Sequence, residues 1–342
     1  MMDILSDDTI YMRRALQLAA CGYGHTFTNP MVGAVIVAPD GRIIGEGWHR
    51  RYGGPHAEVN AVRSVSAADK HLLPESTIYV TLEPCSHFGK TPPCSSMLIR
   101  ERLRRVVVGA SDPFPEVAGR GLKMLRDAGC EVTTGVMEQE CIELNLHFMT
   151  AHRLGRPFVM LKWAQSADGY IGTGITDDGS DNPSRVVFSS MLGQLAVHRL
   201  RASFQGVMAG VNTVIADNPR LDCRLWPTLC QPVAISQQSR RIPADARILQ
   251  RDHILREPSE SLAGFLRRLY TEQRFNAILV EGGHDVLQEF IRLDLFDAIR
   301  VETSPSLLGH GVKAPDFNPS ALTLKENLQI GGNSVMLYRH RH

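Results

Sequence analysis

The residues best suited to catalysis are one histidine, one glutamate and two cysteines in the first third of the chain. His56 and Glu58 lie two positions apart, and Cys85 and Cys94 are separated by eight residues within the stretch TLEPCSHFGKTPPC. One imidazole and two thiolates are the number of protein ligands that zinc takes in a catalytic site, where the fourth position is left to water. We therefore expect His56, Cys85 and Cys94 to bind Zn²⁺, with Glu58 beside the ion.

Glu58 has the chemistry of a proton shuttle. Zinc lowers the pKa of bound water to about 7, and a neighbouring carboxylate can pass that proton to a departing amine. Zinc deaminases carry the pattern H-x-E followed by P-C-x-x-C, and this chain differs from it by the eight residues between its cysteines. Either half of the pattern alone is usually packing, but the two halves in this order favour a hydrolytic deaminase.

Composition limits the class of protein. The chain has 342 residues, of which 43% are apolar and 21% charged, and a formal net charge of +1. This length predicts two domains, and the charge balance favours small-molecule partners over nucleic acid or membranes. The first residues lack the features of a signal peptide, no apolar run could span a membrane, and the seven cysteines have no framework spacing. These features indicate a cytoplasmic protein.

Apolar segments alternate with helical patterns in both halves, which predicts an α/β fold throughout. In the first half we expect a helix ending at Gly22, a hairpin turning at residues 39–41, strands at 76–82, 104–110 and 130–135, and helices around 57–68, 95–102, 119–128 and 137–152. The segment 154–157 contains glycine and proline and is the expected boundary between domains 1–150 and 156–342.

The second half offers further strands and one candidate phosphate site. We expect strands at FVMLKWA, GVMAG, PVAIS, AILVEGG and AIRVETSP, and helices near 190–203, 260–273 and 284–293. Gly282 and Gly283 end a strand before a helix, where backbone amides can bind a phosphate, although a plain tight turn has the same pattern. No G-x-G-x-x-G follows a strand, so a Rossmann domain is not supported. Lys162 lies in an apolar strand and needs a charged partner, for which Asp168 is the candidate.

Four stretches of the first half resemble the deaminase half of the bifunctional riboflavin-biosynthesis deaminase/reductases, a family with the same eight-residue spacer. They are NPMVGAVIV (29–37), HAEVNA (56–61), TLEPCSHFGKTPPC (81–94) and DPFPEVAGRG (112–121). The resemblance implies a cytidine-deaminase-like α/β/α domain that deaminates 2,5-diamino-6-ribosylamino-4(3H)-pyrimidinone 5′-phosphate. It also implies zinc ligands, a proton shuttle and pocket residues at His56, Cys85 and Cys94, at Glu58, and at Asn29, His49, His87 and Lys90, respectively. Phe114 stands where the family usually has asparagine.

Two stretches of the second half, 156–172 and 210–224, are similar to the reductase half of the same family. The resemblance implies a dihydrofolate-reductase-like α/β domain that uses NADPH to reduce the ribosyl group to ribityl. By family position, the cofactor would contact Thr213, Asp217, Gly282 and Gly283, and the substrate would contact Arg201, Leu221, Arg224 and Glu281. The chain departs from the family pattern at Val187 and Phe188, where Trp-Ile is usual, and at Ser236, where aspartate is usual.

Two other hypotheses remain open at this stage. In one, the chain is a deaminase whose second domain has lost reduction and serves binding or assembly, as the departures at Val187 and Ser236 suggest. In the other, the zinc motif acts on a base in nucleic acid, which requires a basic face that this near-neutral chain does not obviously have. The sequence also leaves open whether the chain forms a homo-oligomer.

Overall fold

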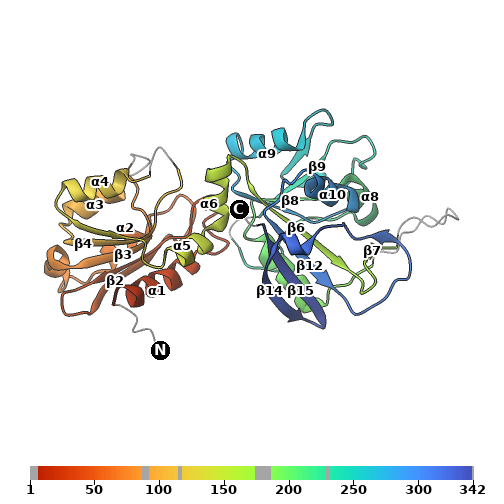
Figure 1. The fold of residues 1–342 in the computed structure, drawn as a ribbon. Coiled ribbons are helices and arrows are strands. Elements are labelled where there is room, and N and C mark those ends of the chain that lie inside the picture. Colours follow the sequence, from red (N-terminus) through yellow and green to blue (C-terminus); the bar gives the residue numbers. More distant parts are fainter. Residues whose placement is uncertain (1–6, 87–91, 115–117, 174–185, 229–230, 341–342) are drawn as a thin grey trace. The chain divides into compact units, whose positions relative to one another are not determined.

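The computed structural model describes residues 7–86, 92–114, 118–173, 186–228 and 231–340. It divides the chain into two compact units, Met1–Leu154 and Gly155–His342. The division falls inside the segment 154–157 that the sequence indicates as a boundary. Figure 1 shows that each unit has a sheet with helices packed on it.

The first unit contains a five-stranded sheet in the order β2-β1-β3-β4-β5. The strand β1 (Gly33–Val37) is antiparallel to both of its neighbours, β2 (Ile43–Trp48) and β3 (Thr77–Leu82). The strands β4 (Arg105–Ala110) and β5 (Glu131–Thr134) continue the sheet in parallel with β3. The hairpin and the three further strands predicted for this half are therefore confirmed.

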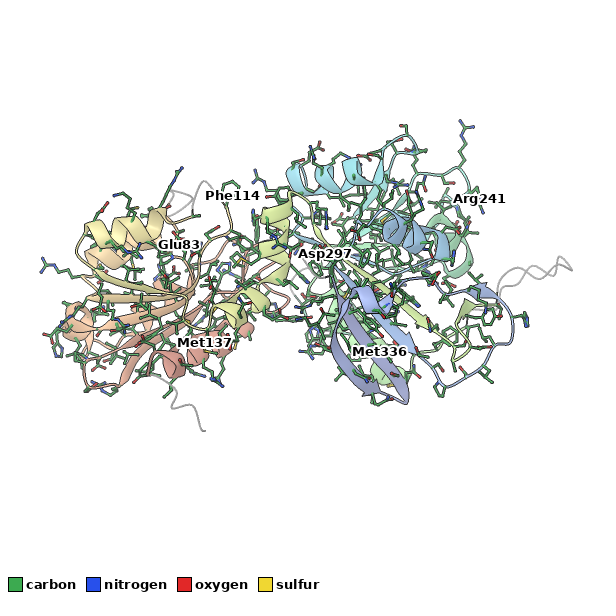
Figure 2. The ribbon with its side chains drawn as sticks, in the orientation of Figure 1. Glu83, Phe114, Met137, Arg241, Asp297 and Met336 are labelled. Carbon is green, nitrogen blue, oxygen red and sulfur yellow. The ribbon has the colours of Figure 1, made fainter. Side chains whose placement is uncertain are left out.

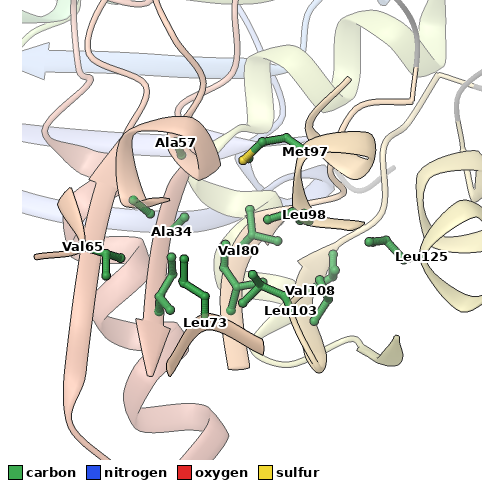
Figure 3. Packing of buried hydrophobic residues seen from close by; sticks show 14 of the residues in the cluster. Ala34, Ala57, Val65, Leu73, Val80, Met97, Leu98, Leu103, Val108 and Leu125 are labelled. Atoms are coloured by element: carbon green, nitrogen blue, oxygen red, sulfur yellow. The ribbon is translucent and has the colours of Figure 1, made fainter. Parts of the chain in front are cut away.

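Helices cover both faces of this sheet, because successive side chains of its strands point to opposite sides. Ala34 and Ile36 of β1 belong to the core formed with α2, α3 and α4, part of which is shown in Figure 3, whereas Val35 and Val37 pack against α1 and α5. This is the predicted α/β/α arrangement. The helices of the unit are α1 (Asp7–Ala20), α2 (Ala57–Ser64), α3 (Cys94–Arg100), α4 (Arg120–Asp127), α5 (Glu138–Leu144) and α6 (Leu146–Leu154), with a 3-10 turn at Lys70–Glu75. The single helix expected over 137–152 is thus two helices, separated at Asn145.

A glycine on β2 lets α2 lie directly against the sheet. A Cβ atom at Gly47 would come 2.3 Å from the backbone nitrogen of Ala61. This distance is too short for any side chain, so only glycine fits here. This close approach matters for function, since α2 begins with the residues that the sequence singles out, His56 and Glu58.

An ion pair ties α1 to the sheet. Asp8 receives two hydrogen bonds of 2.8 Å from the guanidinium of Arg105 on β4, and one of 2.9 Å from the hydroxyl of Tyr79 on β3. The hydrogen bonds from Arg105 lower the pKa of Asp8 from its ordinary value of 3.8. The carboxylate is therefore more stable in the folded protein than in the unfolded chain.

We expect Asp8→Asn to lower the free energy of unfolding by about 1–2 kcal/mol at neutral pH. Because folding lowers the pKa of Asp8, its stabilisation is fully present above 3.8 and is lost as the pH falls through the folded-state value. Urea unfolding of both proteins over a series of decreasing pH values measures the difference, which should shrink towards acid. A difference that is constant over the whole series would contradict this account.

The second unit is built on an eight-stranded sheet in the order β10-β9-β8-β11-β6-β12-β15-β14. The strands from β10 to β12 are parallel, and β15 and β14 continue as antiparallel neighbours. The members are β6 (Phe158–Gln165), β8 (Gly206–Met208), β9 (Val233–Gln237), β10 (His253–Arg256), β11 (Ala277–Val280), β12 (Ala298–Thr303), β14 (Thr323–Ile330) and β15 (Asn333–Arg339). A small second sheet pairs β7 (Tyr170–Gly172) with β13 (Val312–Lys313). The helices are α7 (Met191–Arg201), α8 (Val211–Asp217), α9 (Leu262–Thr271) and α10 (His284–Arg292), with 3-10 turns at Arg247–Gln250 and Pro319–Ala321.

The five predicted strands and three predicted helices of this half are present, and the α/β class is confirmed. The sequence did not indicate α8, β10 or the β14–β15 hairpin. The strand β14 has six consecutive exposed residues, and Glu326 interrupts the alternation of its apolar residues, by which a half-buried strand is identified. In the part of the chain that the structure describes, no helix combines the length and the apolar character needed to cross a bilayer.

Candidate zinc and cofactor sites

His56 and Glu58 lie where α2 begins. His56 is the N-cap, with an extended backbone at φ −69° and ψ 166°, and Glu58 lies in the first turn. Two residues at this spacing would diverge in the middle of a helix, but the extended N-cap allows both side chains to face one place. The spacing of His56 and Glu58 therefore allows them to share a pocket only because the helix begins at this point.

The two cysteines come from the segment between β3 and α3. Cys85 follows the end of β3, and Cys94 is the first residue of α3, whose amide donates a hydrogen bond of 3.3 Å to Sγ of Cys85. The Nδ1 atom of His56 lies 3.6 Å from Sγ of Cys85 and 3.4 Å from Sγ of Cys94. The three ligand atoms all lie within 4.8 Å of one another.

This donor set fits zinc. Zinc–sulfur bonds of about 2.3 Å and zinc–nitrogen bonds of about 2.0 Å hold tetrahedral ligands about 3.5–3.8 Å apart, close to the two nitrogen–sulfur distances above. Within the described ranges, the group comprises three His, Cys, Asp or Glu side chains and not four. Three protein ligands are typical of catalytic zinc, whereas structural zinc takes four.

The three side chains are joined by hydrogen bonds, and a bound cation would take the place of the protons in them. The hydrogen bond with Cys94 lowers the pKa of Cys85 to about 4, and the same interaction raises the pKa of Cys94. The thiolate of Cys85 in turn raises the pKa of His56 through its hydrogen bond to the imidazole. Metal binding releases such protons, since zinc takes thiolates and neutral imidazole as ligands.

Glu58 is a buried carboxyl with free hydrogen-bonding capacity. Only 3% of the residue is exposed, and burial raises its pKa to about 7. Its Oε2 atom has no hydrogen-bond partner among the described residues. A carboxyl group in this environment can accept and release a proton near neutral pH, as a shuttle must.

Asn29 and His49 form a hydrogen-bonded pair beside the three ligands. The Nδ2 atom of Asn29 lies 3.0 Å from Nε2 of His49, and Nδ1 of His49 lies 3.1 Å from the carbonyl oxygen of Pro55. The rings of His49 and His56 meet edge to face, with centroids 5.7 Å apart. Burial lowers the pKa of His49, so its imidazole stays neutral to lower pH than an exposed histidine. The structure therefore brings Asn29 and His49 to the ligand cluster.

The other predicted pocket residues of this unit are less defined. His87 and Lys90 lie outside the described residues. Phe114 packs edge to face on His152, with ring centroids 5.7 Å apart, and His152 also contacts Phe148. The phenylalanine that replaces the family's usual asparagine is thus part of an aromatic cluster with α6.

Glu83 is an important residue that the sequence reasoning missed. It lies between β3 and Cys85, is 5% exposed and is labelled in Figure 2. Its carboxylate accepts hydrogen bonds from the backbone amides of Asp112 (3.4 Å), Gly119 (3.0 Å) and Gly121 (3.2 Å). A Cβ atom at Gly121 would lie 2.1 Å from the carbonyl oxygen of Pro84. The position of Glu83 next to the Pro-Cys pair was the one available signal.

We expect Glu83→Gln to destabilise the first unit by about 2–3 kcal/mol. The amide NH2 of glutamine would replace one of the two accepting oxygens and would face backbone N–H groups that need an acceptor. Chemical unfolding followed by far-UV circular dichroism measures the change. The matched control is Glu101→Gln, which alters a glutamate at the end of α3 whose carboxylate lies 3.6 Å from the guanidinium of Arg100. Equal stability of the two variants would show that Glu83 does not anchor this segment.

In the second unit, three of the four predicted cofactor residues, Gly282, Gly283 and Thr213, meet at the end of β11. Gly283 is the N-cap of α10 with φ +74°, and the amide of Gly210 donates a hydrogen bond of 3.1 Å to the carbonyl of Gly282. A Cβ atom at Gly283 would lie 3.0 Å from Oγ1 of Thr213. Thr213 of α8 thus borders the turn, and Asp217 is the last residue of that helix. The open helix start and the threonine hydroxyl fit a phosphate group.

The predicted substrate residues Arg201 and Glu281 form an ion pair with each other. Nε and Nη2 of Arg201 donate to the two carboxylate oxygens of Glu281 at 2.7 and 2.6 Å, and Nη1 donates to the carbonyl of Asp222 at 2.7 Å. Burial would raise the pKa of Glu281, but the charge of Arg201 outweighs it and brings the pKa to about 2. The guanidinium group of Arg201, expected to contact the substrate, is therefore paired with a carboxylate of the protein in this structure.

Lys162 belongs to the same buried cluster, and its expected partner was wrong. Loss of hydration lowers its pKa, while the carboxylates of Glu281 and Glu302 act in the opposite direction. Asp168 instead accepts hydrogen bonds from the amides of Leu308 (3.1 Å) and Gly309 (2.7 Å). Asp168 therefore shapes a loop, because a carboxylate bound by backbone amides is already satisfied.

The remaining predicted residues lie near this cluster or within the sheet. Leu221 is buried with a left-handed backbone at φ 52°, and Arg224 is paired with Asp222. Ser236 is fully buried on β9 and donates a hydrogen bond of 2.9 Å to the carbonyl of Ala209, so it joins two strands. Of the two residues that depart from the usual Trp-Ile, Val187 is exposed, while the carbonyl of Phe188 accepts a bond from Asn333.

Both units match known families. Residues 5–110 match the cytidine and deoxycytidylate deaminase zinc-binding region, and residues 157–335 match the RibD C-terminal domain. Riboflavin biosynthesis protein RibD of Aquifex aeolicus is 38% identical over 352 residues, which covers 96% of this chain and 95% of the relative. RibD of Escherichia coli is 36% identical, covering 88% of this chain and 89% of the relative.

Solved structures give the same result over both units. RibD of Acinetobacter baumannii superimposes with a TM-score of 0.87 at 32% identity, covering 98% of this chain and 99% of that chain. A deaminase/reductase from Thermotoga maritima superimposes with a TM-score of 0.85 at 32% identity, with the same coverage. From its zinc-binding deaminase region to its reductase domain, the chain belongs to the RibD family of bifunctional riboflavin-biosynthesis deaminase/reductases.

Proposed function

We propose that residues 1–150 deaminate 2,5-diamino-6-ribosylamino-4(3H)-pyrimidinone 5′-phosphate and that residues 156–342 then reduce the ribosyl group of the product with NADPH. The Thermotoga protein is named a diaminohydroxyphosphoribosylaminopyrimidine deaminase and 5-amino-6-(5-phosphoribosylamino)uracil reductase. The observation that carries the proposal for this chain is the convergence of one imidazole and two thiols beside the buried carboxyl of Glu58.

In the deaminase step, His56, Cys85 and Cys94 would hold zinc, which when bound supplies a Lewis acid that activates water. Glu58 takes the proton of the attacking water and delivers it to the leaving amino group, so that ammonia departs and a carbonyl is formed at the ring carbon. Asn29 and His49 lie beside the His56 ligand and would orient the pyrimidine ring by hydrogen bonds. Lys90 would pair with the phosphate as a point charge.

In the reductase step, bound NADPH would supply a hydride for C1 of the ring-opened ribosylimine, and the chain must supply a proton to the imine nitrogen. Lys162 is a buried acid whose pKa is lowered by loss of hydration, which favours proton release. Glu281 lies one residue beyond β11, the strand that pairs with β6 where Lys162 is located. We assign Lys162 as the proton donor and Glu281 as the group that positions the sugar hydroxyls.

The compartment is part of the proposal. Cys21 is an exposed free thiol, and Cys130 is a partly exposed one. Free thiols of this kind, and zinc bound by two cysteines, are typical of proteins of a reducing compartment. We therefore propose that the enzyme acts in the cytoplasm.

The test is a coupled assay on the purified full-length chain with the phosphorylated pyrimidine and NADPH. We expect release of ammonia, followed by oxidation of NADPH in a one-to-one ratio. Ammonia release without NADPH oxidation would support the alternative in which the second domain only binds or assembles. Absence of both, together with tight and salt-dependent binding of single-stranded RNA, would support a deaminase of nucleic acid.

A further inference from the structure

A pocket of about 310 Å³ lies at the carboxyl ends of β8, β9 and β10 in the second unit. Its lining includes Met208 at the end of β8 with Gly210 just beyond it, Ser239 and Arg241 beyond β9, and Arg256 at the end of β10. It reaches Gly283 at the start of α10, the only one of the four predicted cofactor residues in its lining. The pocket therefore extends from the turn at Gly283 away from Thr213 and Asp217.

The order of strands decides which end of the cofactor this pocket would receive. The turn at Gly282 and Gly283 follows β11, and the cluster of Lys162, Arg201 and Glu281 is centred on β11 and its neighbour β6. On the other side of β11 the sheet continues through β8 and β9 to β10. A dinucleotide with its pyrophosphate at the turn and its reactive ring at the cluster must extend its adenosine half towards β9 and β10.

Arg256 presents an incompletely satisfied cation to this pocket. Its side chain is 7% exposed, and its Nε atom is buried without a partner among the described residues. Among the described residues, its contact with a carboxylate is a long one, 3.4 Å from Nη1 to Oε1 of Glu289. A buried guanidinium with free donors is costly unless an anion binds it, and phosphate fits its planar fork.

Three other charged side chains line the pocket and bear on which anion it would bind. Arg241, labelled in Figure 2, adds a second cation, while Asp285 and Glu289 of α10 add two acids. Acids near the adenosine ribose suit the free hydroxyl of NADH, whereas an arginine accommodates the 2′-phosphate of NADPH. Because Glu289 and Asp285 repel a phosphate, discrimination in favour of NADPH needs the arginines to outweigh them.

We propose that Arg256, assisted by Arg241, binds the 2′-phosphate of the adenosine ribose and thereby selects NADPH over NADH. This inference rests on the proposed reductase function and adds to it the residue that determines cofactor specificity. The ligand is recognised as a phosphomonoester on a ribose, held between two guanidinium groups at the carboxyl ends of parallel strands.

The test compares two fragments of the cofactor by titration calorimetry on the full-length protein. Adenosine 2′,5′-bisphosphate carries the 2′-phosphate and adenosine 5′-monophosphate lacks it. We expect the wild type to bind the bisphosphate more tightly, and Arg256→Gln to lose about 10- to 100-fold of that affinity with little change for the monophosphate. Arg256→Lys should retain part of the preference, and Arg247→Gln, which alters an exposed arginine outside this pocket, should retain all of it.

Monophosphate binding also reports whether the variant is folded. If Arg256→Gln loses it as well, Arg241→Gln carries the test, because that side chain is exposed, and it must weaken the bisphosphate selectively. A preference for the bisphosphate that survives substitution of either arginine would overturn the inference. A wild type that oxidises neither NADPH nor NADH would instead contradict the proposed reductase function. A wild type that oxidises NADPH, with unchanged selectivity in the variants, would contradict only the role of Arg256.

Discussion

Replacement of Glu58 by glutamine is expected to slow ammonia release by about 100- to 10,000-fold while the protein keeps its zinc. Glutamine preserves the volume of the buried side chain but cannot take a proton from water or deliver one to the leaving amine. Glu58 is not a member of the group of three ligands, so the metal content should not change. Ammonia release by an enzyme-coupled assay and zinc by elemental analysis, both on the same preparation, measure the two effects.

Two further variants make this result specific. Glu75→Gln changes an exposed glutamate of the same unit and should leave both zinc and activity unchanged. Cys85→Ser removes a proposed ligand, and we expect it to lose zinc as well as ammonia release. Loss of zinc from Glu58→Gln would show that the glutamate is a ligand, and full activity in that variant would exclude it as the shuttle.

Replacement of Glu281 by glutamine is expected to lower the free energy of unfolding of the second unit by about 3–5 kcal/mol and to abolish NADPH oxidation. Glu281 is ionised at neutral pH, and its loss leaves the guanidinium of Arg201 and the ammonium of Lys162 buried without their common counter-charge. Urea unfolding followed by tryptophan fluorescence in a Trp48→Phe background reports on this unit, because the remaining tryptophans, Trp163 and Trp226, both belong to it.

The first unit provides the internal control for this variant. Ammonia release should persist in Glu281→Gln under conditions in which the second unit remains folded. Glu272→Gln, which alters an exposed glutamate at the end of α9, should unfold like the wild type and oxidise NADPH normally. A Glu281 variant with unchanged stability and normal NADPH oxidation would show that the pair with Arg201 supports neither the unit nor its reaction.

The sequence predicted the structure best where residues that are close along the chain are also close in space. His56 and Glu58 are two residues apart at a helix start, and Cys85 and Cys94 flank one loop, so few arrangements of these side chains exist. The same holds for the β1–β2 hairpin, where a turn triplet joins two apolar runs. Local periodicity also predicted most helices and strands, although not the exposed β14, in which Glu326 interrupts the apolar alternation and no face is buried.

Contacts between distant segments were not predictable in the same way. The sequence offered Arg201 as a substrate contact and Asp168 as the partner of Lys162, yet Arg201 binds Glu281, eighty positions along the chain. Glu83 likewise accepts amides from a segment about thirty residues later. Any arginine or glutamate has many oppositely charged candidates in a chain of this size, and only the packing of strands decides between them.

The sequence by itself determined three properties of this protein: a set of zinc-type ligands with an acid nearby, two α/β units, and the family to which the chain belongs. Those properties depend on residue identity and on short spacings, which survive without coordinates. The tertiary structure alone decided which buried charges are paired, which backbone amides Glu83 satisfies, and that Arg256 faces the pocket beyond β9 and β10 with a free donor. These depend on strand order and on burial, because a charge is stabilised or left unsatisfied only by the groups that folding places around it.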